Sequence, residues 1–177
     1  MTLQHIAAAL ERAAAALKRR PDLATYEDAP ATARWTGGLH CISSHPNGIA
    51  IATDLPEGIG GAGGHVSPGW LMRASLASCA ASSIVLCAAT AAIELTSLEI
   101  VVGSRSDARG MLGVAGDDGR AVDPAPLAFD VVIRLSARGV SKERLEELVA
   151  TSLRCSPVPA AIAHGVPAHV RVEIEAA

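Results

Sequence analysis

The sequence is poor in aromatic residues and has no excess of positive charge. Its 177 residues include only four aromatics (Tyr26, Trp35, Trp70 and Phe129), and the formal net charge at pH 7 is −3. Nucleic-acid-binding proteins use basic side chains to neutralise phosphates, and many stack bases on aromatic rings. The one basic cluster, Lys18-Arg19-Arg20, is typical of a solvated helix end. We therefore expect no nucleic-acid partner.

Metal-ligand and cofactor motifs are also lacking. The four cysteines form no C-x-x-C pair and the six histidines show no H-x-x-x-H spacing. A glycine-rich stretch at 58–63 fits G-x-G-x-x-G formally, but residues 65–68 separate it from the next predicted helix. The acidic residue that a dinucleotide site needs about 20 residues later is missing. We expect no metal and no cofactor.

Residues 74–93 carry no charge, and this uncharged segment is long enough to span a bilayer. Most of these residues are Ala and Ser, which contribute little to transfer into lipid, whereas small residues allow close packing in a core. A buried central helix is therefore favoured over a membrane span. The N-terminal segment lacks the basic start of a signal peptide, so we expect a cytoplasmic location, where paired cysteines tend to be catalytic or redox-sensing.

Half of the residues are hydrophobic, which suits one compact domain. The local patterns predict an α+β fold, with an N-terminal helix and linker over residues 1–30 and the main domain over 31–177. We expect the first helix to cover an apolar face of a dimer. The predicted helices are 2–20, 68–92 and 142–153. The predicted strands are 31–35, 39–43, 49–53, 98–104, 129–135 and 166–174, with two more strands around a turn at 116–119.

Two cysteines stand near predicted helix termini. Cys79 lies in the central helix, and Cys155 opens a predicted turn at 155–159. Ser75, Ser82 and Ser83 share a helix face with Cys79 and could donate hydrogen bonds to its thiolate. The same serines could instead bond to carbonyls of their own helix, leaving Cys79 as a space-filling residue. The spacing favours neither alternative.

Together these segments resemble the osmotically induced protein C and organic hydroperoxide resistance (OsmC/Ohr) family over roughly residues 31–175. One departure is Ser156, which is inserted between the late cysteine and its proline. The segments that carry the resemblance are Gly60–Gly64, Ser67-Pro68-Gly69-Trp70-Leu71, Ala77-Ser78-Cys79, Cys155-Ser156-Pro157-Val158 and His169–Ile174.

The resemblance implies an OsmC-like fold, in which a long central helix packs against antiparallel strands and two chains intertwine as a homodimer. It also implies a role in oxidative-stress defence. Cys79 would be the peroxidatic thiol and would attack an organic hydroperoxide to form a sulfenic acid. Cys155 would resolve this acid as a disulfide, and a dithiol partner would reduce the disulfide.

The family's Arg and Glu at the active site are not matched here. Gly69 stands where the family has Glu, and Leu39 is among the residues found where Arg is expected. Without a nearby cation a cysteine is only a few per cent ionised at neutral pH. Arg34 and Arg154 are candidate replacements, and Glu57 could orient either one.

The unmatched residues leave an alternative open. The chain could keep the OsmC-like fold as a catalytically inactive dimer that binds a small molecule or senses thiols.

Overall fold

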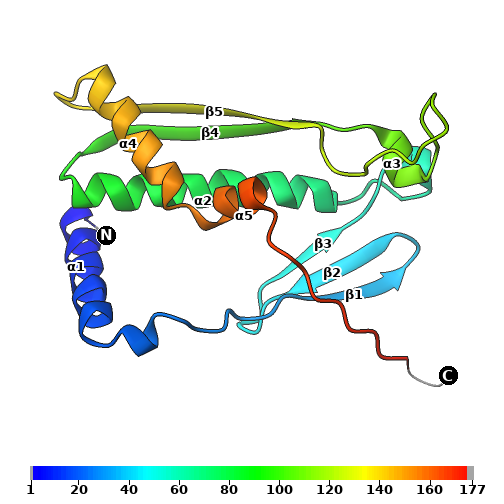
Figure 1. The fold of residues 1–177 in the computed structure, drawn as a ribbon, viewed down its shortest axis with the longest axis horizontal. Coiled ribbons are helices and arrows are strands. Elements are labelled where there is room, and N and C mark those ends of the chain that lie inside the picture. The colour runs from blue at the N-terminus through cyan, green and yellow to red at the C-terminus, as the bar shows by residue number, and fades with distance from the viewer. Residues whose placement is uncertain (1, 175–177) are drawn as a thin grey trace.

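A 23-residue helix, α2 (Pro68–Thr90), runs through the middle of the molecule (Figure 1). The structure is a computed structural model that describes residues 2–174. As predicted, Ser67 caps this helix by accepting a hydrogen bond from the backbone N–H of Trp70 at 3.1 Å, and Pro68 is the first helical residue.

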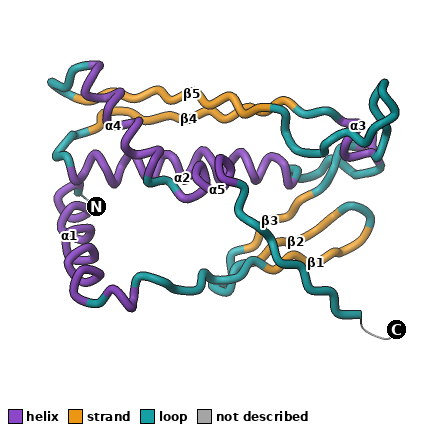
Figure 2. The backbone as a smooth tube through the Cα atoms, in the orientation of Figure 1, coloured by secondary structure: helices purple, strands orange, loops and turns teal. Residues whose placement is uncertain are grey.

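The described chain has mixed helices and antiparallel strands (Figure 2). The strands form a three-stranded sheet in the order β1-β2-β3 and a separate β4–β5 pair, and all pairings are antiparallel. The α+β prediction is thus confirmed. The remaining elements are α1 (Leu3–Arg19), a 3-10 turn (Pro21–Leu23), β1 (Thr32–Gly37), β2 (His40–Ser44), β3 (Ala50–Thr53), a 3-10 turn (Glu57–Ile59), β4 (Leu95–Arg105), α3 (Ala108–Leu112), β5 (Ala128–Ala137), α4 (Lys142–Arg154) and α5 (Pro157–His164).

The hydrophobic core lies between α2, the β4–β5 pair and α4. Its buried centre consists of Ile84 and Ala88 from α2, Ile93 just after it, and Leu148 from α4. Apolar side chains of both long strands pack against this centre. Ala88 is fully buried, and its small side chain lets the neighbouring elements approach the helix closely.

Among the described residues, α2 is the one helix long and apolar enough to cross a membrane, with a mean hydropathy of 1.6. In this structure it is the helix against which β4, α4, α1 and α5 pack. This arrangement agrees with the prediction of a central helix.

The N-terminal helix α1 packs against α2. Thr2 caps it as predicted, by accepting a hydrogen bond from the backbone N–H of His5. Together α1, α2 and α4 line an apolar cavity of about 570 Å³ that includes Leu10, Cys87 and Leu148. The inward side of α1 thus faces apolar parts of α2 and α4 within one chain, and its expected place on an apolar face of a dimer stays a prediction.

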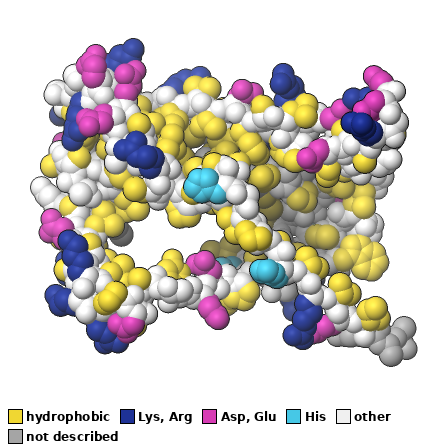
Figure 3. All heavy atoms as spheres, viewed as in Figure 1, with side chains coloured by type: hydrophobic (Ala, Val, Ile, Leu, Met, Phe, Trp, Pro, Cys, Tyr) yellow, Lys and Arg dark blue, Asp and Glu magenta, His cyan; other side chains and the backbone are white. Residues whose placement is uncertain are grey.

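The three-stranded sheet lies away from the core, and the linker after α1 runs along one side of an open space to reach it (Figures 1 and 3). Large apolar side chains are exposed on this sheet and on the β4–β5 pair. They include Trp35, Ile42 and Ile51 on the first and Val101, Val131 and Val132 on the second. Apolar surface of this extent normally marks a contact with another molecule.

The predicted closing strand at 166–174 is wrong for this structure. The described chain beyond α5 is irregular and extends away from the core (Figure 1), with Val170 84% and Ile174 92% exposed. A strand needs a neighbour to pair its backbone N–H and C=O groups. The alternating pattern of Val170, Val172 and Ile174 is present, but no strand within residues 2–174 lies beside it.

The segment between β4 and β5 also differs from the prediction. The turn at 116–119 forms, but it is flanked by a single bridge between Ala115 and Ala121 and not by two strands. The short helix α3, capped by Asp107, was not predicted. Gly110 on α3 passes so close to the chain at Asp123 that a Cβ there would lie 2.6 Å from a backbone oxygen. The segment is thus held by close packing of its backbone at Gly110, and not by the strand pairing that was expected around the turn.

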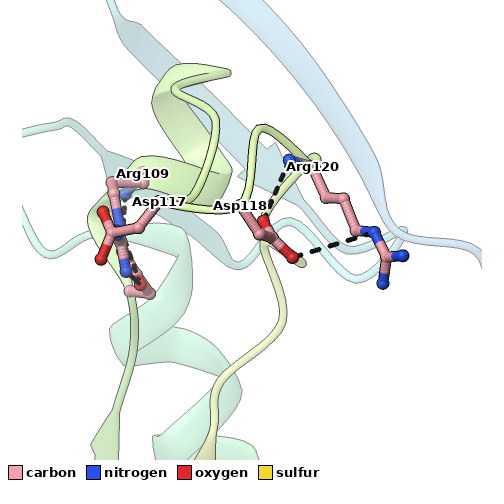
Figure 4. Close-up of polar contacts among 5 residues, drawn as sticks. Arg109, Asp117, Asp118 and Arg120 are labelled. Atoms are coloured by element: carbon pink, nitrogen blue, oxygen red, sulfur yellow. Dashed lines mark hydrogen bonds and ion pairs between the residues drawn. The ribbon is translucent and has the colours of Figure 1, made fainter.

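Several exposed ion pairs occur in the same segment (Figure 4). Arg109 pairs with Asp107 at 2.7 Å and with Asp117 at 3.4 Å, and Arg120 lies 3.8 Å from Asp118. Pairs this exposed add little to stability, because water screens them. They hold the loop's shape and bring no nucleophile or acid–base pair together.

Candidate active site

Cys79 lies in the middle of α2, half-buried, where the start of α5 packs against that helix. Figure 2 shows α5 in front of α2, and the two helices are in contact. The contact joins residues 77 or more positions apart in sequence, so it forms only when the chain folds.

Two hydrogen bonds converge on the Cys79 sulfur. The hydroxyl of Ser156 donates to Cys79 Sγ at 3.2 Å, and the backbone N–H of Val158 donates to the same atom at 3.4 Å. Ser156 is fully buried, so its hydroxyl has no access to bulk water. These donors stabilise electron density on the sulfur.

The sulfur also lies at the positive end of a helix. Ser156 is the N-cap of α5, Pro157 is its first residue and Val158 follows. Backbone N–H groups at a helix N-terminus carry partial positive charge and favour anions. Reactive cysteines are found at such helix starts because thiolate is the nucleophilic form. The arrangement therefore suits nucleophilic chemistry at Cys79.

The segment predicted as a turn at 155–159 instead begins this helix. Ser-Pro at 156–157 is the same start signal that places α2 at Ser67-Pro68. The chain after Cys155 is helical as far as His164. The backbone N–H groups of its first turn are therefore aligned toward Cys79, as they would not be in an irregular turn.

Cys155 immediately precedes this contact. It is the C-cap of α4, its backbone N–H donates to Ser152 O at 3.1 Å, and its side chain is exposed. Folding thus brings the segment of Cys155 to Cys79, whereas the group that touches the Cys79 sulfur is the next residue, Ser156. A disulfide between the two cysteines stays a prediction.

The three predicted polar helpers lie elsewhere in the described structure. Arg34 is exposed on β1, and Glu57 is exposed at the start of the 3-10 turn before the glycine loop. Arg154 donates to Thr151 of its own helix at 3.1 Å. Within residues 2–174, Cys79 forms its hydrogen bonds with none of these three side chains. Their roles stay predictions.

Arg73 is a further cation and lies on α2. It is close to Gly69, the position where the family has Glu. Its Nη1 would be 3.8 Å from a Cβ at Gly69, and it donates to Ser104 Oγ on β4 at 3.1 Å. This bond directs the guanidinium to the β4 side of the helix.

Of Ser75, Ser82 and Ser83, Ser75 behaves as the second of the two alternatives describes, because its hydroxyl bonds to a carbonyl of its own helix. Ser75 Oγ donates to Met72 O at 2.8 Å, and Ser78 Oγ donates to Ser75 O at 3.2 Å. Ser83 is buried. The hydroxyl that reaches Cys79 belongs to Ser156, and the sequence signal that could have found it is the Ser-Pro helix start.

The glycine-rich loop folds around an acid of its own chain. Asp54 is buried, and its carboxylate accepts hydrogen bonds from the backbone N–H groups of Leu55 at 2.7 Å and Ala62 at 3.0 Å. The bond from Leu55 is the main reason that the pKa of Asp54 lies below its ordinary value. A Cβ at Gly61 would lie 1.8 Å from Leu55 O, so glycine is required there. The backbone N–H groups of Leu55 and Ala62 are thus already bound to the Asp54 carboxylate and are not free to bind a nucleotide phosphate.

No group of three or more His, Cys, Asp or Glu side chains that could hold a metal ion occurs among residues 2–174. The other two cysteines are separate from the site: Cys41 pairs with Trp35 and Thr53 in the three-stranded sheet, and Cys87 lines the cavity beside α1.

Comparison with known proteins adds a family and a fold. A family model described as OsmC-like protein matches residues 61–171. No curated protein sequence matches the chain.

Solved structures resemble this one at low sequence identity. An organic hydroperoxide resistance protein OsmC from Legionella pneumophila is 21% identical, with a TM-score of 0.58 over 79% of this chain and 92% of its own. An OsmC-like protein from Mycoplasma pneumoniae is 13% identical, with a TM-score of 0.64 over 79% and 90%. An OsmC-like protein of unknown function from Vibrio cholerae is 12% identical, with a TM-score of 0.60 over 77% and 94%. At these identities the likeness shows a shared fold.

Proposed function

Because this chain belongs to the OsmC-like protein family, we propose that it is a thiol-dependent peroxidase that reduces organic hydroperoxides in oxidative-stress defence. The observation that carries the proposal is the pair of hydrogen bonds from Ser156 and Val158 to the Cys79 sulfur at the start of α5. The name of the Legionella relative, an organic hydroperoxide resistance protein, supports the same class of substrate. We also propose that the protein acts in the cytoplasm, where thiols are kept reduced.

The reaction has three balanced steps. The Cys79 thiolate attacks the outer oxygen of the hydroperoxide, the O–O bond breaks, and the alkoxide takes a proton to leave as an alcohol. Cys79 is now a sulfenic acid. The Cys155 thiol attacks this sulfur, and a disulfide forms with loss of water. A dithiol then reduces the disulfide by exchange and is itself oxidised.

The neighbourhood of Cys79 supports the first step. Ser156 and the N-terminus of α5 stabilise negative charge on the sulfur before attack. Cys155 is one residue from Ser156, so a local change of the chain between α4 and α5 would be needed to bring its thiol to the Cys79 sulfur.

The test uses reduced wild-type protein, cumene hydroperoxide and an excess of a small dithiol. We expect peroxide to be consumed over many turnovers. Without the dithiol, peptide mass mapping is expected to find Cys79 linked to Cys155, with Cys41 and Cys87 free. Peroxide loss at the rate of the dithiol alone would remove the proposal, and a link that uses Cys41 or Cys87 would contradict the assigned pair.

One observation favours the second candidate, an inactive small-molecule-binding or thiol-sensing dimer. In the described residues the Cys79 sulfur has no cationic side chain among its hydrogen-bond partners. The same assay separates the two, because a sensor is oxidised once by peroxide and does not turn over with the dithiol.

We further propose that the protein is a homodimer in which the central helices of two chains meet. Ser75, Ser78, Ser82 and Leu86 are exposed on one face of α2 in the single chain. The apolar faces of both sheets are exposed as well. Small residues on a helix allow a second helix to approach closely.

Light scattering on the eluted protein is expected to give twice the mass of the chain. Ser82→Arg places a long charged side chain in the small-residue face, so we expect it to shift the mass to that of one chain or to cause aggregation. Ser106→Arg, at an exposed loop position just after β4, is the control and should remain dimeric. A monomeric wild type, or a Ser82→Arg protein that dimerises normally, would contradict the proposed interface.

A further inference from the structure

Ser156 is an N-cap residue that does not cap its own helix. The other N-cap hydroxyls at Thr2, Ser67 and Ser141 each accept a hydrogen bond from a backbone N–H in the first turn of their helix. Ser156 makes no such bond. Its hydroxyl is directed at the Cys79 sulfur of α2 instead.

The sulfur occupies the place of the missing cap. The backbone N–H of Val158, one of the unpaired donors of the first turn, donates to Cys79 Sγ. The first turn of α5 therefore obtains its hydrogen-bond acceptor from another helix. An anionic acceptor makes stronger bonds than a neutral one to the same donors, so this arrangement is more favourable with a thiolate than with a thiol.

Burial strengthens the effect. Ser156 is 0% exposed, and the sulfur itself is half-buried. In such surroundings a hydrogen bond is electrostatically stronger than in water, and water competes little for the donor. The serine that separates Cys155 from Pro157 thus places a hydroxyl at the sulfur, which has no charged hydrogen-bond partner among residues 2–174.

We propose that Ser156 is a further catalytic residue, whose hydroxyl, with the N–H of Val158, holds the Cys79 sulfur as a thiolate at the start of α5. This assignment rests on Cys79 being the reacting group of the proposed function. It does not require that peroxide is the substrate.

The experiment measures alkylation of Cys79 by iodoacetamide as a function of pH, resolved by peptide mass spectrometry, in the full-length protein. Ser156→Ala removes the hydroxyl and leaves space for the smaller side chain. We expect alkylation of Cys79 to slow about tenfold near pH 7, which is the effect of losing one hydrogen bond to a charged group. The rate profile of the variant should lie below that of the wild type around neutral pH.

Ser152→Ala is the matched control. Ser152 is also fully buried, and its hydroxyl donates to Leu148 O of its own helix at 2.7 Å. It should leave the Cys79 profile unchanged, because it loses a buried hydroxyl without a bond to the sulfur. Ser156→Thr keeps a hydroxyl and should retain most of the wild-type rate.

An unchanged profile in Ser156→Ala would overturn the proposal. So would an equal shift in Ser152→Ala, which would mean that any loosening of the α4–α5 region has the same effect. Alkylation uses no peroxide, so the outcomes are separable. A shifted profile in a protein without peroxidase turnover would keep this inference and remove the proposed function, and an unchanged profile in an active peroxidase would do the reverse.

Discussion

Cys79→Ser is expected to reduce consumption of organic hydroperoxide to the background rate of the dithiol, a loss on the order of 10³-fold or more. A serine hydroxyl is almost entirely protonated at neutral pH, so it is a poor nucleophile toward an O–O bond. The assay is the loss of cumene hydroperoxide with time, measured for wild type and variant at equal protein concentration.

The fold should survive this substitution. A serine Oγ at position 79 can still accept hydrogen bonds from Ser156 and Val158, so the first turn of α5 keeps an acceptor. Circular dichroism and the melting temperature are therefore expected to stay close to those of the wild type. A lost rate with an intact fold assigns the effect to the sulfur.

Cys87→Ser supplies the matched control on the same helix. Cys87 lines the cavity beside α1 and makes no recorded contact with Cys79 among the described residues. Its replacement should leave turnover within about twofold of the wild-type value. Substitutions of exposed or half-buried residues far from a site have small effects. Turnover that depends on Cys87 and not on Cys79 would contradict the assigned nucleophile.

The central helix could be predicted from the sequence because its signals are local. Ser67-Pro68 marks its start and an uncharged stretch marks its length, and both operate within the helix itself. The start of α5 carries the same Ser-Pro signal at 156–157, yet the prediction treated that segment as a turn. Two prolines within the first three residues of α5 look like turn residues, although a helix tolerates proline in its first turn.

The prediction of a closing strand was wrong because a strand, unlike a helix, depends on a partner that lies elsewhere in the sequence or in another chain. Val170, Val172 and Ile174 alternate as in a strand, but residues 166–174 are irregular and pair with no strand within the described chain. Sequence periodicity indicates which face of a strand is apolar and does not supply the strand beside it. A partner chain would supply one in the dimer proposed above.

The site was predicted in part. The sequence singled out Cys79 and the segment of Cys155, and folding does bring that segment to Cys79. The donors to the sulfur came from another element, because helix-face spacing left the α2 serines undecided, and the hydroxyls of Ser75 and Ser78 bond to carbonyls of their own helix. Which hydroxyl reaches a sulfur is decided by packing between elements, and spacing along one helix does not report it.

Cys155→Ser is expected to make oxidation of the protein irreversible. When wild type is treated with excess hydroperoxide without a reductant, Cys155 should capture the Cys79 sulfenic acid as a disulfide, which a dithiol later reduces. Without Cys155 the sulfenic acid persists and reacts with more peroxide to form sulfinic acid, which a dithiol does not reduce. We expect most of the Cys79 thiol to be recovered in wild type and little in the variant, measured by peptide mass spectrometry after dithiol treatment. Cys41→Ser is the control and should recover like wild type.

This outcome also bears on the chain between α4 and α5. In the reduced structure the buried hydroxyl of Ser156 faces the Cys79 sulfur, and the Cys155 side chain is exposed. A disulfide needs the two Cβ atoms about 3.5–4.5 Å apart, so Cys155 has to turn inward and displace Ser156. Oxidation should therefore weaken the first turn of α5, and amide exchange of Val158 should rise in the oxidised wild type but not in Cys155→Ser. Full recovery of the Cys79 thiol in Cys155→Ser would show that another thiol, or a partner molecule, resolves the sulfenic acid.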